Sequence, residues 1–258
     1  MLYDGAVFLK DFGMNKTEIK LQYDICDKKD SAIPVIIVAA GTSTRMNGIN
    51  KQFMPVLGVP VIARTLMAFE HCNDISKIII VTSKESILDM QLICEKYAIS
   101  KLCDIIPGGD CRHRSVMAGI KRLDNDDKKV LIHDGARPFV ETKIISAVVD
   151  ALNDFDAALC VSKINDTVKK LSDDGTVTAT VDRSMLYSAQ TPQGVDVEKY
   201  KIACQNVAGV EALTDDASIM EAAGYSVKAV LGSGKNIKIT TPDDISIAEA
   251  LVRGENEV

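Results

Sequence analysis

Short apolar runs alternate with segments of helical periodicity along most of this chain. Five runs are rich in β-branched residues and almost wholly apolar, which is typical of strands covered on both faces of a sheet. These runs occupy residues 34–40, 77–82, 102–106, 129–133 and 157–161. Between them apolar residues recur every three or four positions, as at Ile62, Leu66 and Phe69, which predicts helices that pack on the sheet. Repeated strand–helix–strand units predict an α/β fold, a mostly parallel sheet with helices on both faces.

The chain ends with a clear helix signal. Thr241 is a predicted N-cap, Pro242 occupies the first helical position, and two acids follow in the first turn. Lys238 precedes this helix, and we place it on a short strand. The predicted domain covers residues 34–252, and residues 253–258 form a tail.

Residues 163–186 interrupt the alternation. The runs "TVKKL" and "TVTATV" flank the turn signal "SDDG", which predicts a β-hairpin. Its strands are polar and have little to bury, and a two-stranded ribbon is marginal by itself. We therefore expect this β-arm to lean on another surface, such as a second subunit.

The first 33 residues form an N-terminal extension to the predicted domain. Ile19, Leu21, Tyr23 and Ile25 alternate with polar residues, as in a half-buried strand. Two interpretations stay open for this extension, an added hairpin and a partly ordered tail.

Composition narrows the function. The chain has 258 residues, a net charge of −6, only 5% aromatic residues and no tryptophan, which disfavours a general nucleic-acid surface. No apolar run approaches the roughly 18 residues of a membrane span, and no signal peptide is evident. The seven cysteines include no C-x-x-C pair, so we expect free thiols in a cytoplasmic protein.

The loop after the first predicted strand carries the first candidate chemistry. It reads "AAGTSTRMNGINKQF" and contains neither a Walker A motif nor G-x-G-x-x-G. Small residues let backbone N–H groups approach phosphate oxygens, and Arg45 and Lys51 supply positive charge. This pattern indicates an anion-binding loop, and a solvated surface loop is the alternative.

Two further loops follow predicted strands and therefore lie at the same edge of the sheet. In "HDGARPF", Asp134 is well placed to hold Mg²⁺, and Arg137 either pins the loop or contacts phosphate. A structural Asp–Arg pair is the alternative. In "PGGDCRHRSV", Ser115 lies where a helix begins, and the start of the helix offers N–H donors to an anion or a polar base edge. A turn after the strand followed by an N-cap is the alternative. We expect Arg112 and Arg114 to be solvated.

Eight motifs occur in the order found in one enzyme family. They are "AAGTSTRM…KQF", "GGDCRHRSV", "HDGARPF", "NDTV", "VDR", "QTPQG", "LTDDAS" and "NIKITTPDD". Over about residues 34–252 the chain resembles the 2-C-methyl-D-erythritol 4-phosphate cytidylyltransferases of isoprenoid precursor biosynthesis. Each motif alone is weak, whereas eight in order are specific.

The resemblance implies a Rossmann-like nucleotidyltransferase fold, a homodimer and the substrates CTP and methylerythritol 4-phosphate, with pyrophosphate as a product. It implies that Arg45, Lys51 and Lys238 are catalytic and that Asp134 binds Mg²⁺. The residues implied around the nucleotide are Ala39, Ala40, Gly41, Gly109, Asp110 and Ser115. Those implied for the acceptor phosphate are Thr167 and Arg183 on a β-arm that crosses into the neighbouring subunit, with Thr191, Thr214 and Arg137.

Two positions depart from the family pattern. Gly135 replaces an alanine, and Lys235 stands where an acid is common, which puts a second metal carboxylate in doubt. A ribitol 5-phosphate cytidylyltransferase is the alternative with the same chemistry, although that relative carries "HDSVRP". An NAD-binding oxidoreductase is disfavoured by the missing G-x-G-x-x-G, and a non-catalytic nucleotide-binding protein is disfavoured by the complete set of charged residues.

Overall fold

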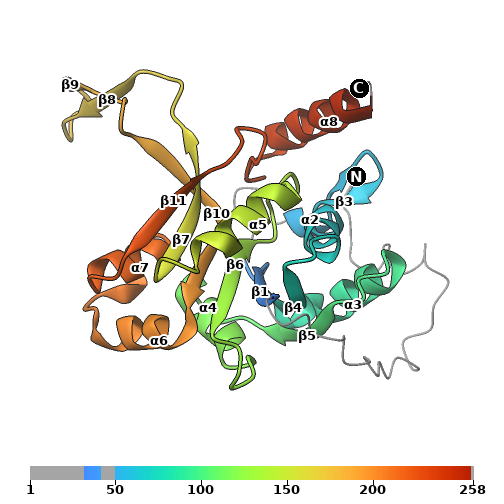
Figure 1. Cartoon of the computed structure of the whole chain (residues 1–258). Coiled ribbons are helices and arrows are strands. Elements are labelled where there is room, and N and C mark those ends of the chain that lie inside the picture. Colours follow the sequence, from blue (N-terminus) through green and yellow to red (C-terminus); the bar gives the residue numbers. More distant parts are fainter. Residues whose placement is uncertain (1–31, 42–49, 257–258) are drawn as a thin grey trace.

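A seven-stranded sheet organises the chain (Figure 1). The computed structural model of the protein describes residues 32–41 and 50–256. The strand order is β11–β7–β10–β6–β1–β4–β5. The strands are β1 (Ile33–Val38), β4 (Ile75–Thr82), β5 (Leu102–Pro107), β6 (Lys129–Asp134), β7 (Ala157–Lys163), β10 (Tyr187–Asp196) and β11 (Val227–Leu231).

The sheet is parallel except at β10, which runs antiparallel to both β6 and β7. All five predicted strands are present, so the prediction of a mostly parallel α/β sheet is confirmed. The strands β10 and β11 were not predicted. The first contains Pro192 and several polar residues, and the second is a half-exposed edge strand, so neither has the apolar pattern of the central strands.

Helices cover both faces of the sheet, because side chains of successive strand residues point to opposite faces. Val35 and Ile37 of β1 belong to one buried cluster and Ile36 belongs to the other. The first face carries α2 (Val61–Glu70), α3 (Ile87–Lys96) and α5 (Thr142–Ala151). The second face carries α4 (Arg112–Ile120), α6 (Val197–Asn206) and α7 (Asp216–Ala222).

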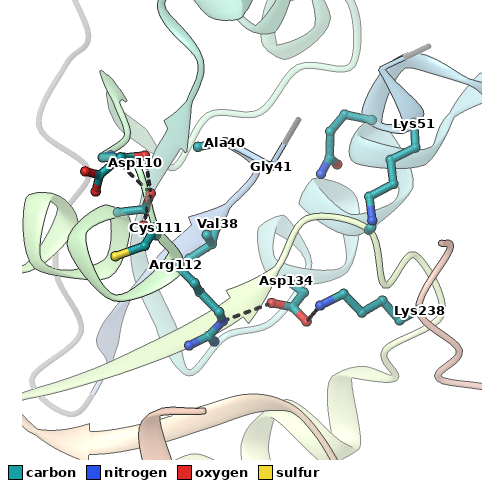
Figure 2. Close-up of a pocket in the computed structure, with 13 residues that line it drawn as sticks. Val38, Ala40, Gly41, Lys51, Asp110, Cys111, Arg112, Asp134 and Lys238 are labelled. Carbon is teal, nitrogen blue, oxygen red and sulfur yellow. Dashed lines mark hydrogen bonds and ion pairs between the residues drawn. The ribbon is translucent and has the colours of Figure 1, made fainter. Parts of the chain in front are cut away.

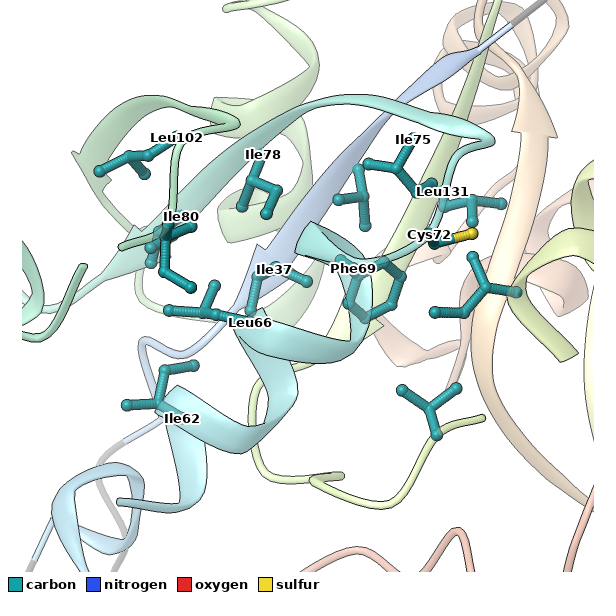
Figure 3. Packing of buried hydrophobic residues seen from close by; sticks show 14 of the residues in the cluster. Ile37, Ile62, Leu66, Phe69, Cys72, Ile75, Ile78, Ile80, Leu102 and Leu131 are labelled. Carbon is teal, nitrogen blue, oxygen red and sulfur yellow. The ribbon is translucent and has the colours of Figure 1, made fainter. Parts of the chain in front are cut away.

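Figure 3 shows the first cluster, in which Leu66 and Phe69 of α2 lie against Ile37 and Ile78 of the sheet. With Ile62, these helix residues are fully buried, as their spacing predicts.

The last helix, α8 (Pro242–Asn256), begins where the sequence predicts. The carboxylate of Asp244 accepts hydrogen bonds from the backbone N–H groups of Thr240 and Thr241, at 2.8 Å each, which fixes the start of the helix. The helix continues past residue 252 and so includes most of the predicted tail. It packs through Ala248 and Val252 near a small hairpin, β2 (Pro55–Val56) and β3 (Val59–Pro60).

The prediction of a short strand around Lys238 is wrong. Residues 236–240 have no ladder partner, and the backbone N–H of Ile239 donates one hydrogen bond to the carbonyl of Ala136. This loop is extended, but it is held by individual contacts.

The predicted hairpin is present as β8 (Val168–Leu171) and β9 (Val177–Val181), which pair antiparallel in a sheet of their own. It projects from the body of the molecule as a β-arm (Figure 1). Gly175 has a φ of +84° in its turn, a conformation that glycine adopts without strain. Leu171 and Val177 are more than half exposed.

Three single-turn helices complete the described elements, namely η2 (Lys51–Phe53), η3 (Lys84–Ser86) and η4 (Val210–Ala212). No helix in the described part of the chain has the length and apolar character needed to cross a membrane. The predicted N-terminal extension and Arg45 fall outside the described residues, apart from the start of β1.

Candidate active site

A pocket of about 350 Å³ opens at the carboxyl edge of the parallel strands (Figure 2). Its walls come from the segments that follow β1, β5 and β6, together with η2 and the loop before α8. The lining residues are Val38, Ala40, Gly41, Lys51, Gln52, Gly109, Asp110, Cys111, Arg112, Ser115, Asp134, Ala136 and Lys238. Three predicted loops therefore meet in one place, where ligands of open α/β sheets bind.

Asp134 is the last residue of β6, and three cations surround its buried carboxylate. Lys238 Nζ lies 2.8 Å from Oδ2, and Arg137 Nε lies 3.6 Å from the same oxygen. Arg112 Nε lies 3.7 Å from Oδ1. Burial favours the protonated acid, but the charges of Lys238 and Arg112 outweigh it and hold the pKa of Asp134 well below its usual range. Asp134 is thus ionised at neutral pH.

Two hydrogen bonds hold the loop that carries Lys238 in place. Arg137 donates to the carbonyl of Asn236 at 2.7 Å, and the Asn236 side chain donates to the carbonyl of Thr191 at 2.9 Å. The Arg137 side chain is only 11% exposed, and Arg137 does not line the pocket. Of the two roles considered for Arg137, this position supports the one that pins the loop.

Lys51 enters the pocket from the side opposite Arg112 (Figure 2). It begins η2, whose N-cap residue Asn50 accepts a hydrogen bond from the Gln52 backbone N–H. The Asn50 amide also donates to Ser86 Oγ at 3.2 Å, which ties this turn to η3.

Five of the six residues predicted to surround the nucleotide line the pocket: Ala40, Gly41, Gly109, Asp110 and Ser115. The sixth, Ala39, is buried, and its backbone N–H donates to the carbonyl of Val81. Ser115 Oγ accepts a hydrogen bond from the Gly109 backbone N–H at 3.1 Å. This bond holds the glycine loop against the first turn of α4.

Gly108 allows this close approach. A Cβ atom at this position would lie 2.5 Å from the Cβ of Ala40 and 2.8 Å from Ser115 Oγ. Both contacts are shorter than packed atoms allow, so a side chain at residue 108 would push the two walls of the pocket apart.

Arg112 is the residue that the sequence interpretation missed. It does not extend into solvent but lines the pocket and pairs with Asp134 and Asp216, whose carboxylate it meets at 2.7 Å. Arg114 behaves as expected and pairs with Asp110 and Glu211 on the surface. Helical spacing could have separated the two arginines, since Arg112 shares a face with the buried Ser115 and Val116.

The residues predicted for the acceptor phosphate are not gathered in this pocket. Thr191 is buried, and its Oγ1 accepts a hydrogen bond from the Asp134 backbone N–H at 3.0 Å. Thr214 is exposed immediately before α7. Thr167 and Arg183 are exposed at the base of the β-arm, where the Arg183 guanidinium donates to the carbonyl of Asn165. None of these four residues lines the pocket.

The donor set suits Mg²⁺ only together with phosphate oxygens. The Asp134 carboxylate is a hard ligand, yet Lys238, Arg112 and Arg137 would repel a bare divalent cation there. Among the described residues that line the pocket, the other carboxylate is that of Asp110, which pairs with Arg114. Mg²⁺ commonly uses one or two carboxylates plus substrate phosphates, and this arrangement fits Asp134.

A separate acidic group lies away from the pocket. Asp124, Asp126 and Asp127 precede β6 and so lie at the opposite edge of the sheet from Asp134. Lys77 pairs with Asp124 and Asp127 at 2.6 Å each. This group does not contribute to the site.

Comparison with known proteins decides the family. The sequence pattern of 2-C-methyl-D-erythritol 4-phosphate cytidylyltransferase matches residues 33–254 of this chain. The chain belongs to this family. The cytidylyltransferase of that name from Halalkalibacterium halodurans is 42% identical over 220 residues, which cover 84% of this chain and 96% of the relative. The one from Clostridium novyi is 39% identical over 224 residues, covering 84% and 95% of the two chains.

Solved structures of the cytidylyltransferase family share the fold. The crystal structure of 4-diphosphocytidyl-2C-methyl-D-erythritol synthase from Anaerococcus prevotii has a TM-score of 0.77 and 33% identity, and covers 86% of this chain and 96% of that one. The cytidylyltransferase from Thermus thermophilus has a TM-score of 0.69 and 29% identity, with 86% and 99% coverage. The predictions of family and of a Rossmann-like nucleotidyltransferase fold are therefore confirmed.

Proposed function

We propose that this enzyme transfers the cytidylyl group of CTP to 2-C-methyl-D-erythritol 4-phosphate and releases pyrophosphate. The observation that carries the proposal is the convergence of Lys51, Lys238 and Asp134 on one pocket beside the glycine loop. The relatives whose names state this activity span nearly the whole described domain.

The attacking group is a phosphate oxygen of the acceptor. A phosphate monoester has a second pKa of about 6, so it is already ionised at neutral pH and needs no general base. His133 is not available as one. Burial lowers its pKa to about 3, and its two ring nitrogens face Thr191 Oγ1 and the carbonyl of Arg137.

The barrier is the repulsion between a dianionic phosphate and a triphosphate. Lys51 and Lys238 line the pocket, and their charges neutralise phosphate oxygens without reorganisation, which is the main contribution available in phosphoryl-type transfers. Mg²⁺ bound with Asp134 supplies further neutralisation of the triphosphate. Arg45 is the third cationic side chain in this proposal.

Selection of the nucleotide rests on the loops after β1 and β5. Small residues at Ala40, Gly41 and Gly109 let phosphate oxygens or polar edges of the base approach the backbone closely. Ser115 stabilises the second loop through its hydrogen bond with Gly109.

The acceptor site in this proposal is shared between two subunits. Thr167 and Arg183 belong to the β-arm, which leaves the body of its own chain (Figure 1). Leu171 and Val177 on the arm and Met185 after it are 54–83% exposed, and apolar side chains in that setting favour contact with another protein surface. A homodimer with crossed arms would cover them and bring Arg183 to the partner's pocket.

The proposed compartment is the cytoplasm. Six described cysteines are free thiols, which fits a reducing environment.

The identity of the acceptor is tested by measuring pyrophosphate release from CTP with methylerythritol 4-phosphate and with ribitol 5-phosphate in parallel. We expect kcat/KM to favour methylerythritol 4-phosphate by at least about 100-fold, because a polar site leaves groups unpaired with the wrong alcohol. A preference for ribitol 5-phosphate would replace the proposed acceptor. Turnover of neither would overturn the proposed reaction.

A further inference from the structure

The guanidinium of Arg112 lies between two carboxylates that belong to different parts of the fold. Its Nε faces Asp134 Oδ1 at 3.7 Å, and its Nη2 faces Asp216 Oδ2 at 2.7 Å. The Asp134 and Asp216 side chains are 10% and 1% exposed. These two acids raise the pKa of Arg112 despite its burial, so its guanidinium is charged at neutral pH.

Hydrogen bonds hold Asp216 in place. It is the first residue of α7, and its Oδ1 accepts a 2.8 Å hydrogen bond from the Tyr200 hydroxyl. Its backbone N–H donates to Gln193 Oε1 at 2.9 Å, and Gln193 also donates to Asp215 at 3.0 Å. A buried network therefore locks the start of α7 onto β10 and α6.

We propose that Arg112 is a positioning residue for the transfer reaction, which orients the Asp134 carboxylate and ties it to the segment before α7. This inference rests on the proposed function. Thr214, a predicted acceptor residue, lies two positions before Asp216. Through Arg112, the carboxylate that suits Mg²⁺ and the segment that carries Thr214 keep a fixed spacing.

The chemistry of the bridge requires arginine. The Nε and Nη2 groups lie along one edge of a planar guanidinium, so one side chain forms ion pairs with two separate carboxylates at 3.7 and 2.7 Å. Lysine at this position would offer one point charge and could not hold both carboxylates at once. If the pair only stabilised the fold, lysine would substitute with little effect on the reaction.

The test compares Arg112→Lys and Arg112→Met with Asp216→Asn, which removes the charge at the far end of the bridge. Arg122→Met is the matched control, since Arg122 lies just after the end of α4, pairs with Asp104 and does not line the pocket. Each variant is assayed for kcat and both KM values by pyrophosphate release. Thermal unfolding confirms that each is folded.

We expect Arg112→Lys and Arg112→Met to lower kcat by about 100-fold, as a displacement of about 1 Å at a reacting centre does. Asp216→Asn should lower kcat by about 10-fold. The double variant Arg112→Met with Asp216→Asn should have a kcat no lower than that of Arg112→Met alone, because the two residues act through one bridge. The kcat of the control, Arg122→Met, should stay within about twofold of wild type. A kcat for Arg112→Lys within threefold of wild type would overturn the proposal. So would a loss of kcat in the double variant equal to the product of the two single losses.

Two readouts do not depend on turnover. Mn²⁺ in the presence of CTP should bind Arg112→Lys at least about 10-fold more weakly by electron paramagnetic resonance, because the lysine keeps the charge but no longer orients the carboxylate ligand. Amide hydrogen exchange over residues 213–217 should accelerate about 10-fold or more. Unchanged Mn²⁺ affinity together with unchanged exchange would reject the role of Arg112. Failure of the proposed reaction would instead appear as a wild-type protein that turns over neither acceptor.

Discussion

Lys238 Nζ lies 2.8 Å from Asp134 Oδ2, so a lysine on an irregular loop is held by the carboxylate that ends a central strand. The Lys238 side chain is 38% exposed, whereas that of Asp134 is 10% exposed. The Lys238 ammonium group therefore reaches the opening of the pocket, whereas the Asp134 carboxylate stays buried. This pair keeps Lys238 pointed at the space where phosphates would bind.

Removal of the Lys238 charge should slow the reaction strongly. In Lys238→Met the side chain keeps most of its length, but no cation remains to stabilise charge on the phosphates. We expect kcat to fall about 100-fold or more, measured by pyrophosphate release at saturating substrates. Lys235→Met is the matched control, since Lys235 is exposed on the same loop and outside the pocket. Equal losses in both variants would contradict a specific role for Lys238.

Divalent metal should bind with the nucleotide and poorly without it. Three cations lie within 4 Å of the Asp134 carboxylate, and their repulsion opposes a bare Mn²⁺ ion until phosphates offset it. We expect Mn²⁺ to bind at least about 100-fold more tightly in the presence of CTP, by electron paramagnetic resonance of the free ion. Asp134→Asn should weaken the CTP-dependent binding. Tight binding without CTP that Asp134→Asn abolishes would contradict this expectation.

The central strands and the covering helices could be predicted from sequence because burial on two faces leaves a plain apolar signal. Residues such as Ile36 and Ile79 have no exposed surface, and their neighbours along the strand are also apolar. β10 could not be predicted in this way. It is polar and includes Gln190 and Gln193, whose side chains are buried through hydrogen bonds to distant residues.

The candidate site could also be predicted only in part, because some of its residues have a local sequence pattern and others do not. Asp134 and Lys51 follow strong strand or loop signals, and both line the pocket. The role of Arg112 depends on Asp216, which is far away in sequence and is brought close only by the packing of α7. A pair of this kind has no local pattern, so an arginine in a polar loop appears solvated when the sequence is taken alone.

His133 should make the protein less stable as the pH falls. Its pKa is about 3 in the folded protein and about 6.5 in an unfolded chain, so the unfolded state binds more protons between these values. The contribution is fully present above about pH 6.5 and is lost at up to about 1.4 kcal/mol per pH unit below it. Urea unfolding should therefore show the stability gap between wild type and His133→Gln narrowing from pH 7 to pH 5. A His133→Gln gap that does not narrow would contradict the pKa assignment.

Two glycines next to residues that line the pocket should tolerate alanine very differently. At Gly135 a Cβ would meet Ile62 Cδ1 at 2.9 Å and Gln52 Oε1 at 3.0 Å, and both atoms end flexible side chains that can shift. It would also meet Ala39 Cβ at 3.2 Å, a tight contact that a small movement relieves. At Gly108 the Cβ would meet Ala40 Cβ at 2.5 Å, an atom fixed to the backbone. We expect Gly135→Ala to change the free energy of unfolding by about 1 kcal/mol or less and to keep its activity. Gly108→Ala should raise the KM for CTP roughly tenfold, a loss of about 1.4 kcal/mol in binding. The reverse order of effects would show that the nucleotide loop is not packed in this way.

Mixing two inactive variants should restore activity if each site uses the arm of the other subunit. Lys51→Ala removes a pocket cation, and Arg183→Ala removes an arm residue. In a hybrid dimer with crossed arms, one of the two sites has a native Lys51 and a native Arg183. After subunit exchange of an equal mixture, half of the dimers are hybrids, so about a quarter of wild-type activity should return. Lys51→Ala mixed with Lys238→Ala is the control and should recover none, because both residues belong to the same pocket. Absence of recovery in the first mixture, with exchange shown by mass spectrometry of tagged subunits, would mean that Arg183 does not serve the partner's site.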